Sequence, residues 1–466
     1  MKRKLIIPAL LAATVATAAA GAHAGEAKNI IFFLGDGMGP TAITAARIYQ
    51  YKEEGLLKFE RMERVARIKT YSQDAQTTDS APSMGSYMTG VKIQNEVISM
   101  SPDTKASAPK KDAHGNLTID TCAAANGRPA ATILELAKAH GKAVGAVTTT
   151  EATHATPAST YAHSCHRNSG YAIAVQAVPG GAGYNSALGD GLDVLMGGGL
   201  HHFTPYSADN TKGRADGRDL LAELAARGYA VATDRTQMEA AKPGRKFIGL
   251  YAKEDHLAYE LERSARNAKG EAATQPSLSE MTSKAITLLS EKPEGFFLMV
   301  EGGKIDHGLH DSNAKLALVD LVAFDDAIQT AIDRMQLLDP GLRNTLIVVT
   351  ADHDHTLAFN GTARRGNPIL DIVRNADGTP ARDADGRSYT ALVFGNGPNR
   401  PNARADVASE TALGDHYHQE TGVRIKGETH GGGDVKLYAA GAGAQRFKGT
   451  MENTRVFELM KQAFGF

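Results

Sequence analysis

Short apolar segments alternate with helical stretches along most of this chain of 466 residues. The apolar segments are almost continuously hydrophobic, which is typical of strands that are buried on both faces of a parallel sheet. The alternation predicts an α/β fold with a large, mostly parallel central sheet and helices on both faces. The expected strands are Asn29–Leu34, Ala143–Thr149, Phe296–Val300 and Thr345–Thr350, and the expected helices are Pro129–His140, Ala314–Met335 and Arg455–Phe464.

Two stretches interrupt this alternation. Residues 360–426 are rich in glycine, proline, asparagine, aspartate and arginine around one strand-like segment, Tyr389–Phe394. This composition predicts a subdomain that is inserted into the main fold. Residues 178–218 are rich in glycine and predict a long loop. We therefore expect one large domain over residues 25–466, with the insertion at about 360–426.

The first 24 residues have the pattern of a secretory signal peptide. Lys2, Arg3 and Lys4 precede an apolar run over residues 5–20, and Ala-His-Ala at residues 22–24 suits cleavage. The alternative is an uncleaved membrane anchor, but the apolar run is short and rich in alanine. We expect an exported protein, periplasmic or secreted. No other long apolar segment follows, so we expect no membrane-spanning part.

Charge and cysteine content narrow the possible functions. Removing residues 1–24 takes away three cations and no acid, which moves the formal net charge from −1 to −4. A slightly acidic surface gives no basis for nucleic-acid binding, so we expect none. The chain has two cysteines, Cys122 and Cys165, and an exported protein meets an oxidising compartment. A disulfide between them and two free buried thiols both stay open.

Acidic residues mark the ends of three expected strands. Asp36, Glu301 and Asp352 each lie at or just beyond the carboxyl end of such a strand. Ligands in open parallel sheets bind beyond the carboxyl ends, so these three carboxylates can meet although they are far apart in sequence. Carboxylate oxygens are ligands for both zinc and magnesium. The pattern therefore predicts a metal site at this edge of the sheet.

Histidines extend this acidic set. Asp306 and His310 are four residues apart, so one helical turn can present both side chains to the same metal ion. His353 directly follows Asp352, and His430 lies in a late segment of the chain. Zinc accepts both imidazole and carboxylate ligands. Together with a nucleophile and a phosphate-binding group, such a site would support metal-assisted phosphoryl transfer.

Ser80 and Arg167 are the candidates for these two roles. Asp79 suits a helix cap and Pro82 suits the first turn, so Ser80 would lie at a helix N-terminus, where N–H groups favour an anion. An ordinary helix-terminal serine is the alternative. Arg167 is the candidate for binding phosphate, because a guanidinium group can bind two phosphate oxygens at once. The alternative is that Arg167 forms an ordinary ion pair at the surface.

For two other polar motifs, the sequence does not favour a functional role. His201, His202, His416 and His418 are candidate metal ligands that we expect instead on the solvated surface. The sequence GDGMG from Gly35 lacks the full spacing of a dinucleotide-binding loop, so we predict no dinucleotide site there.

Nine segments in the same order, spanning nearly all of the mature chain, show that it resembles the alkaline phosphatase family. The segments are NIIFFLGDGMG from Asn29, TDSA from Thr78, VTTTEATHATP from Val147, YAHSCHR from Tyr161, DVLMGGG from Asp193, PSLSEMT from Pro276, GFFLMVEGGKIDHGLH from Gly295, VTADHDH from Val349 and GETHGGGDV from Gly427.

The resemblance implies a centre with two zinc ions and one magnesium ion. Asp306, His310 and His430 would bind the first zinc ion. Asp36, Asp352 and His353 would bind the second zinc ion, beside the nucleophile Ser80.

Magnesium would be bound by Asp36, Thr156 and Glu301, with His154 contacting it through water. Arg167 would bind phosphate, and His355 would contact the ligands of the first zinc ion from outside. At positions 154 and 307 the chain has histidines (His154 and His307), as the animal and some marine bacterial members do, whereas other bacterial members have Asp and Lys there.

The resemblance also implies an activity. Phosphate monoesters would be hydrolysed to an alcohol and inorganic phosphate through a covalent phosphoserine, in a homodimer with an alkaline pH optimum. One rival is a related enzyme that acts on diesters or sulfate esters. The other is a non-enzymatic exported protein that binds metal or phosphate, but storage needs no serine nucleophile.

Some features depart from the family pattern. Gln275 and Ala252 stand where the animal members have acidic calcium ligands, so we predict no calcium site. Cys122 matches a family cysteine, whereas Cys165 does not lie at the usual partner position. The stretch 360–426 is similar to the crown subdomain of the family, whose outline varies, so it carries no prediction about substrate choice.

Overall fold

A ten-stranded sheet forms the centre of the protein in a computed structural model that describes residues 27–111, 115–119, 122–266 and 268–466. The predicted signal peptide lies outside the described residues. In spatial order, the strands are β15 (Gly449–Glu452), β2 (Arg64–Lys69), β14 (Val435–Gly441), β8 (Thr345–Thr350), β1 (Asn29–Gly35), β7 (Phe296–Gly302), β3 (Ala143–Glu151), β4 (Val194–Gly198), β6 (Phe247–Leu250) and β5 (Ala230–Ala232).

The sheet is parallel except at β14, which runs antiparallel to both β2 and β8. Every residue of β1 is buried, because β1 lies between β8 and β7 and is covered on both faces. This explains its continuous apolar sequence. The predicted α/β class and the four predicted strands are confirmed, with β1, β3 and β7 extending one or two residues further than expected.

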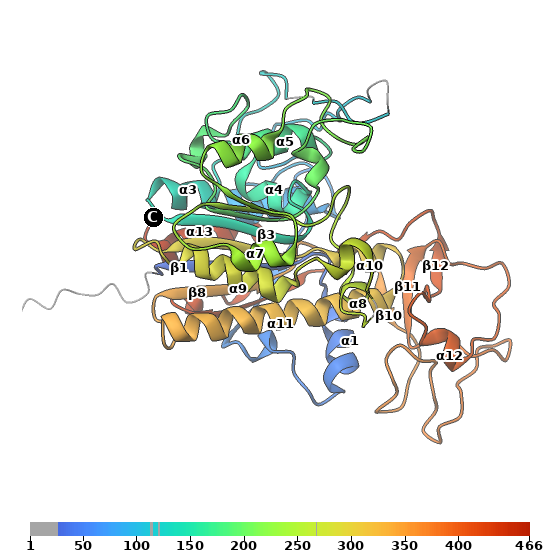
Figure 1. The fold of residues 1–466 in the computed structure, drawn as a ribbon. Helices are drawn as coiled ribbons and strands as arrows, with labels where there is room; N and C mark the ends of the chain where they lie inside the picture. Colours follow the sequence, from blue (N-terminus) through green and yellow to red (C-terminus); the bar gives the residue numbers. More distant parts are fainter. Residues whose placement is uncertain (1–26, 112–114, 120–121, 267) are drawn as a thin grey trace, which may run out of the picture.

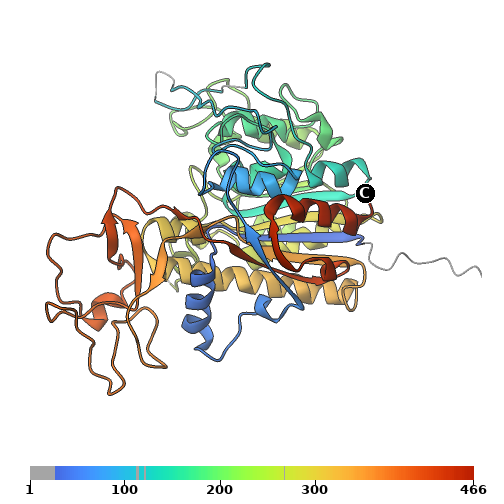
Figure 2. The same cartoon turned by 180° about the vertical axis from the view of Figure 1, so that it is seen from behind.

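Helices cover both faces of the sheet (Figures 1 and 2). One face packs against α9 and α11, and α1 in turn packs on α11, whereas α2 and α13 pack together behind the other face. The helices are α1 (Pro40–Tyr51), α2 (Ser80–Thr89), α3 (Ile133–Ala139), α4 (Ala155–Tyr161), α5 (Gly170–Gln176), α6 (Leu220–Ala226), α7 (Arg235–Ala240), α8 (Glu260–Arg263), α9 (Leu278–Leu289), α10 (Lys304–His310), α11 (Ala314–Leu338), α12 (Ser409–Ala412) and α13 (Asn453–Phe464).

Short 3-10 helices complete the connections. They are η1 (Phe59–Arg61), η2 (Ser186–Leu188), η3 (Leu200–His202), η4 (Gly270–Ala273) and η5 (Ala444–Arg446).

Two predictions about helices and loops need correction. The helix expected from Pro129 begins only at Ile133, because Thr132 caps it: the Thr132 hydroxyl accepts a hydrogen bond from the Glu135 N–H, and the Glu135 carboxylate accepts one from the Thr132 N–H. The stretch 178–218 is not loop throughout, since it contains η2, β4 and η3. Strand β4 was missed because it is only five residues long and ends in glycines.

A smaller sheet lies beside the main body (Figure 1). It consists of β10 (Leu357–Phe359), β11 (Leu392–Gly397) and β12 (Thr421–Arg424). The strand expected at Tyr389–Phe394 therefore lies three residues later and is not the only one. Its first residues pair elsewhere, because the Tyr389 carbonyl accepts a hydrogen bond from the Val373 N–H. The boundaries of the insertion at 360–426 stay a prediction.

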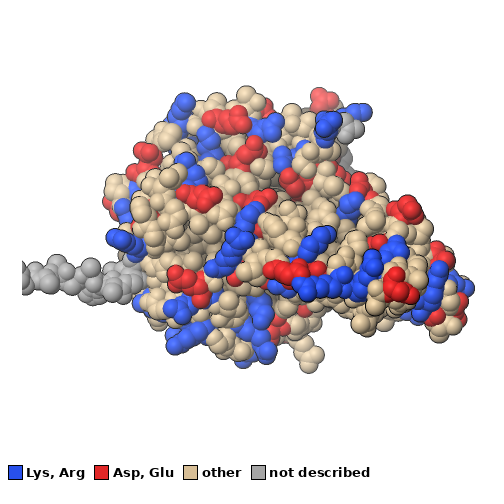
Figure 3. Space-filling view, turned by 90° about the horizontal axis from the view of Figure 1, so that it is seen from below, with Lys and Arg blue, Asp and Glu red and all other residues tan. Residues whose placement is uncertain are grey.

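Acidic and basic side chains alternate over the face seen in Figure 3. This distribution agrees with the nearly neutral composition of the chain. Among the described residues, none of the helices combines the length and the apolar character that crossing a bilayer requires.

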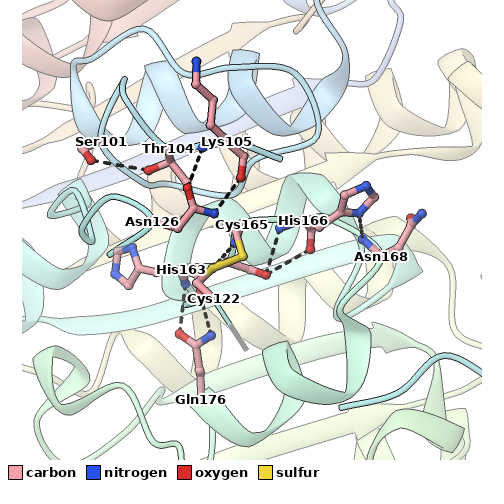
Figure 4. The surroundings of a disulfide bond; sticks show 11 residues. Ser101, Thr104, Lys105, Cys122, Asn126, His163, Cys165, His166, Asn168 and Gln176 are labelled. Carbon is pink, nitrogen blue, oxygen red and sulfur yellow. Dashed lines mark hydrogen bonds between the residues drawn. A yellow bond between two sulfur atoms is a disulfide. The ribbon is translucent and has the colours of Figure 1, made fainter. Parts of the chain in front are cut away.

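A disulfide joins Cys122 to Cys165, which answers the question that the sequence left open (Figure 4). The bridge holds the segment from His163 onward, which is also fixed by Gln176: its side chain accepts a hydrogen bond from the His163 N–H and donates one to the His163 carbonyl. This segment leads into Arg167, so the disulfide restrains the backbone that carries the candidate phosphate-binding residue.

Loss of this bridge should lower stability. Replacing both cysteines with alanine frees a loop of 43 residues in the unfolded chain, and we expect the free energy of unfolding to fall by about 2–4 kcal/mol. Denaturant unfolding of the oxidised parent, the reduced parent and the double variant measures this. The reduced parent is the matched control and should unfold with the double variant. Equal midpoints for the oxidised and reduced parent would contradict the expectation.

Candidate active site

Three acidic residues meet at one edge of the central sheet. Strand β1 lies between β7 and β8, and its residue Leu34 pairs with Glu301 on one side and Thr350 on the other. Asp36 and Asp352, which follow these strands, are therefore brought next to Glu301. All three side chains are fully buried. The predicted convergence of the strand ends is confirmed, and it depends on the register of β1 alone.

Ser80 is the first residue of α2 and lies beside this acidic edge. Asp79 caps the helix by accepting a hydrogen bond from the Ala81 N–H at 2.8 Å, as expected from the sequence. The Ser80 hydroxyl oxygen is 3.5 Å from Asp36 Oδ1 and 3.3 Å from His353 Nε2. The serine is thus held at a helix N-terminus, where N–H groups favour negative charge, and next to possible metal ligands.

Asp306 collects three histidines around one carboxylate oxygen. Its Oδ1 is 3.3 Å from His310 Nε2, 2.8 Å from His355 Nε2 and 3.5 Å from His430 Nε2. Asp306 and His310 lie one turn apart in α10, which confirms the prediction from their spacing. His430 comes from β13 (His430–Gly431), which pairs with β9 (Asp354–His355). These four side chains form a group that could hold one metal ion.

Hydrogen bonds to backbone carbonyls orient the histidines of this group. His310 Nδ1 lies 2.6 Å from the Glu428 carbonyl, and His430 Nδ1 lies 2.9 Å from the Thr78 carbonyl. A carbonyl accepts only, so each Nδ1 carries a proton, and each Nε2 has a lone pair when its ring is neutral. The two Nε2 atoms are 3.0 Å apart and face the same point. Two lone pairs directed at each other fit a shared cation between them.

A second group forms around His353. Its Nε2 is 3.3 Å from Asp36 Oδ1, 3.2 Å from Asp352 Oδ2 and 4.0 Å from Asp306 Oδ1. Gly37 beside it leaves room for His355 of the first group: its φ is +65°, and a Cβ there would lie 2.4 Å from His355 Nε2. Any larger residue at position 37 would displace the histidines.

A third group lies on the other side of Asp36. One oxygen of Asp36, one oxygen of Glu301 and one ring nitrogen of His154 lie within 4.8 Å of one another. The Thr156 hydroxyl donates to Asp36 Oδ2 at 3.4 Å. Glu301 Oε2 accepts from the hydroxyls of Thr148 and Thr150, whereas Glu301 Oε1 has no hydrogen-bond partner among the described residues.

The electrostatics of these groups favour a bound cation. Burial raises the pKa of Glu301 to about 7, and burial followed by repulsion from Asp352 and Asp306 raises the pKa of Asp36. Burial lowers the pKa of His430, so this histidine is neutral at neutral pH. At His310 burial is outweighed by Asp306, which raises the pKa to about 9, so a bound cation would replace a proton there. Buried carboxylates with a free oxygen, beside imidazoles, are the donors that zinc and magnesium use. The chemistry of the donor set therefore fits the ions that the resemblance implies.

Arg167 connects the helix cap with the third group. One of its terminal nitrogens donates to Asp79 Oδ1 at 3.1 Å, and the other lies 3.1 Å from His154 Nε2. Arg167 and His154 also line a cavity of about 770 Å³. Arg167 is therefore not an isolated surface ion pair.

Two residues that the sequence did not single out also support the site. His256 packs against His154 and His307, with ring centroids 5.1 and 4.3 Å away. Glu428 is buried and accepts a hydrogen bond from His355 Nδ1 at 2.6 Å. Spacing gave no signal for His256, although the GETHGGGDV segment did contain Glu428 beside His430.

The prediction for the remaining histidines is half correct. His416 and His418 are exposed, as expected. The prediction for His201 and His202 is wrong, since their side chains are only 7% and 12% exposed. They lie in η3, which folds against the end of β3 instead of extending into solvent.

Comparison with known proteins identifies a family whose model matches nearly the whole chain. A family model described as alkaline phosphatase matches residues 27–466. The tissue-nonspecific alkaline phosphatase of Gallus gallus is 35% identical over 468 residues, which cover 94% of this chain and 84% of that protein. An alkaline phosphatase of Gadus morhua is also 35% identical over 469 residues, covering 94% and 92%.

Solved structures share the fold. The alkaline phosphatase of Thermus thermophilus is similar with a TM-score of 0.68 and 25% identity, over 95% of this chain and 92% of that chain. The alkaline phosphatase of the Antarctic bacterium TAB5 has a TM-score of 0.64 and 24% identity, over 94% and 99%.

The buried carboxylate of Glu428 should control metal affinity without touching the ion. Glu428→Gln removes the charge that orients His355 and leaves the backbone carbonyl that orients His310. We expect zinc affinity at the Asp306 group to fall about 10- to 100-fold. Competition with a chelator of known affinity measures this.

Glu410→Gln, an exposed substitution in α12, is the matched control and should bind zinc like the parent. Equal zinc affinity of Glu428→Gln and the parent would show that Glu428 plays no part in orienting the ligands.

Proposed function

The chain belongs to the alkaline phosphatase family, whose members hydrolyse phosphate monoesters, and from this premise we propose that Ser80 is the nucleophile that carries the phosphoryl group. The position of the Ser80 hydroxyl carries this proposal. It lies at a helix N-terminus, within 3.5 Å of Asp36 and His353, and so next to the second and third of the groups that could hold a metal ion.

We propose that the three groups of side chains hold two zinc ions and one magnesium ion. The first zinc ion would be bound by Asp306, His310 and His430, and the second by Asp36, Asp352 and His353. Magnesium would be bound by Asp36, Thr156 and Glu301, with His154 near it. When bound, these ions would supply positive charge that favours the ionised serine hydroxyl and the charge developing on phosphorus oxygens.

The protein's own residues position the reaction. Ser80 gives up its hydroxyl proton and forms a P–O bond while the bond between phosphorus and the alcohol oxygen breaks, and the alcohol takes up a proton. Water then attacks the phosphoserine, inorganic phosphate leaves, and Ser80 regains a proton. The N–H groups of the first turn of α2 favour the negative oxygens on phosphorus. Asp79 keeps this turn in place by capping it.

Arg167 is proposed to bind the non-bridging phosphate oxygens. Its guanidinium is held from two sides, by Asp79 and by His154, so it loses little freedom when it binds an anion. Two parallel N–H donors match two oxygens of one phosphoryl group, which a lysine cannot do.

The third group favours monoesters over the rival substrates. Asp36, Thr156 and Glu301 offer a further cation position close to Ser80, and additional positive charge suits a phosphoryl group with two negative charges better than a diester or a sulfate ester. A protein that only binds phosphate would need neither Ser80 nor this convergence of ligands.

We also propose that the protein is exported and acts as a homodimer. The disulfide between Cys122 and Cys165 supports export, because such bonds persist in oxidising compartments. The homodimer and a crown-like role for residues 360–426 rest on the family resemblance. Cell fractionation would test export, and light scattering on the purified mature chain would test the homodimer.

Ser80→Ala should abolish hydrolysis by removing the nucleophile. Release of p-nitrophenol from p-nitrophenyl phosphate, its bis ester and p-nitrophenyl sulfate is measured at pH 7 to 10, before chelation, after chelation and after zinc and magnesium are restored. The parent should hydrolyse the monoester fastest, lose activity on chelation and regain it with the metals. Ser80→Ala should lack the phosphoenzyme and bind the same number of metal ions.

Ser264→Ala, an exposed serine, is the matched control and should behave like the parent. Near-normal turnover of Ser80→Ala would disprove its role as nucleophile. Faster turnover of the bis ester or the sulfate by the parent would assign the chain to the rival substrate class.

Arg167→Ala should weaken the binding of phosphate more than it slows turnover. Losing charge-assisted hydrogen bonds to phosphate costs about 1.5–3 kcal/mol, so the inhibition constant for phosphate should rise about 10- to 100-fold. The maximal rate with a good leaving group should fall less. Arg128→Ala, on an exposed arginine, is the control. Unchanged inhibition by phosphate would exclude Arg167 as the phosphate-binding group.

A further inference from the structure

Two neighbouring strand ends bring together a carboxylate and two histidines outside the three groups described above. Glu151 is the last residue of β3, and His201 and His202 lie in η3, which follows β4. The pairing of Glu151 with Gly198 places η3 beside the end of β3. Gly199 permits this turn, since its φ is +76° and a Cβ there would lie 2.9 Å from the Glu151 Cβ.

The distances within this cluster fit one small cation. His201 Nε2 is 3.9 Å from Glu151 Oε1, and His202 Nδ1 is 3.9 Å from Glu151 Oε2. These separations are too long for hydrogen bonds. Zn–N and Zn–O bonds of about 2.0–2.2 Å at a tetrahedral angle place the two ligand atoms about 3.4 Å apart, so a small inward movement of the side chains would let one ion contact the carboxylate and both rings. One ligand atom from each of the three residues lies within 4.8 Å of the others.

The carboxylate of Glu151 lacks the partners that a buried carboxylate ordinarily has. Among the described residues, none donates a hydrogen bond to it. Lys212 is the cation that acts on it electrostatically, but Lys212 is half exposed and also faces Glu254 at 3.6 Å. Burial, followed by Asp255, raises the pKa of Glu151 to about 7. The group therefore stays costly to ionise unless a further cation is present.

An ordinary ion pair with the histidines does not explain the cluster. Burial lowers the pKa of His201 to about 4 and lowers the pKa of His202 well below its ordinary value, so neither ring carries a charge at neutral pH. The Thr153 hydroxyl lies 2.7 Å from His202 Nδ1 and would rotate away when that nitrogen binds an ion, whereas His201 Nδ1 has no hydrogen-bond partner in the described part of the chain. Neutral imidazoles beside an unpaired carboxylate are the ligands that zinc uses.

We propose that Glu151, His201 and His202 form an additional binding site for a divalent transition-metal ion of the zinc class. All three residues line the cavity of about 770 Å³ that also contains Arg167 and His154. Three protein ligands leave a fourth position of a tetrahedral ion open, and here that position faces the cavity, where water or an anionic group can occupy it. The site shares no residue with the three groups around Asp36 and Asp306.

Counting the metal ions in matched variants tests the proposal. The parent, Glu151→Gln and the double variant His201→Gln/His202→Gln are equilibrated with zinc, and bound zinc is measured by mass spectrometry of the metal. We expect each variant to bind one zinc ion fewer per chain than the parent. His416→Gln/His418→Gln, at two exposed histidines, is the control and should match the parent. A folded variant that binds as much zinc as the parent would overturn the proposal.

A second measurement needs no variant. Crystals of the parent equilibrated with zinc are examined for anomalous scattering at the zinc edge. A peak between Glu151, His201 and His202 is expected in addition to any peaks around Asp306. An empty cluster in zinc-equilibrated crystals would overturn the proposal. This measurement does not depend on the proposed phosphatase mechanism. If Ser80→Ala kept its activity, Ser80 would be excluded as nucleophile, but the peak at the cluster would still be expected.

Discussion

Concentrated negative charge, buried where three strands end, is the constraint on which the rest of the structure depends. Asp36, Glu301, Asp306 and Asp352 are all almost inaccessible to solvent, and the three aspartates lie within 4.0 Å of His353. An ionised carboxylate loses several kcal/mol of hydration when it is buried, and neighbouring carboxylates repel one another. Such an arrangement is stable only if cations compensate it, so folding of this region and metal binding are coupled.

The scaffold around this charge is correspondingly rigid. Strand β1 is buried over its whole length between β7 and β8, which leaves no freedom to shift its register. A shift of one residue would exchange the two faces of the strand and separate Asp36 from Glu301. The apolar sequence of β1 therefore has a functional consequence, because the hydrophobic contacts that fix the strand also fix the positions of Asp36 and Glu301.

The sequence predicted those parts of the site that follow from local pattern. Continuous apolar strands, acids at their carboxyl ends, the spacing of Asp306 and His310 and the cap at Asp79 are local features, and each has the expected place. The environment of His201 and His202 could not be predicted, because it depends on how η3 folds back across β3 and β4. The same is true of the Cys122–Cys165 pair and of Glu428, whose partners lie 43 and 73 residues away.

Asp79 has two roles whose combination aligns the proposed nucleophile, Ser80, with the arginine that is proposed to bind phosphate. One of its carboxylate oxygens accepts the hydrogen bond from the Ala81 N–H that caps α2, and the same oxygen accepts from Arg167. The position of Ser80 and the position of the guanidinium are therefore fixed by one carboxylate. The disulfide at Cys165 restrains the backbone two residues before Arg167. Because both ends of this connection are restrained, Arg167 cannot move relative to Ser80 without breaking the helix cap, and the geometry for binding phosphate exists before the substrate arrives.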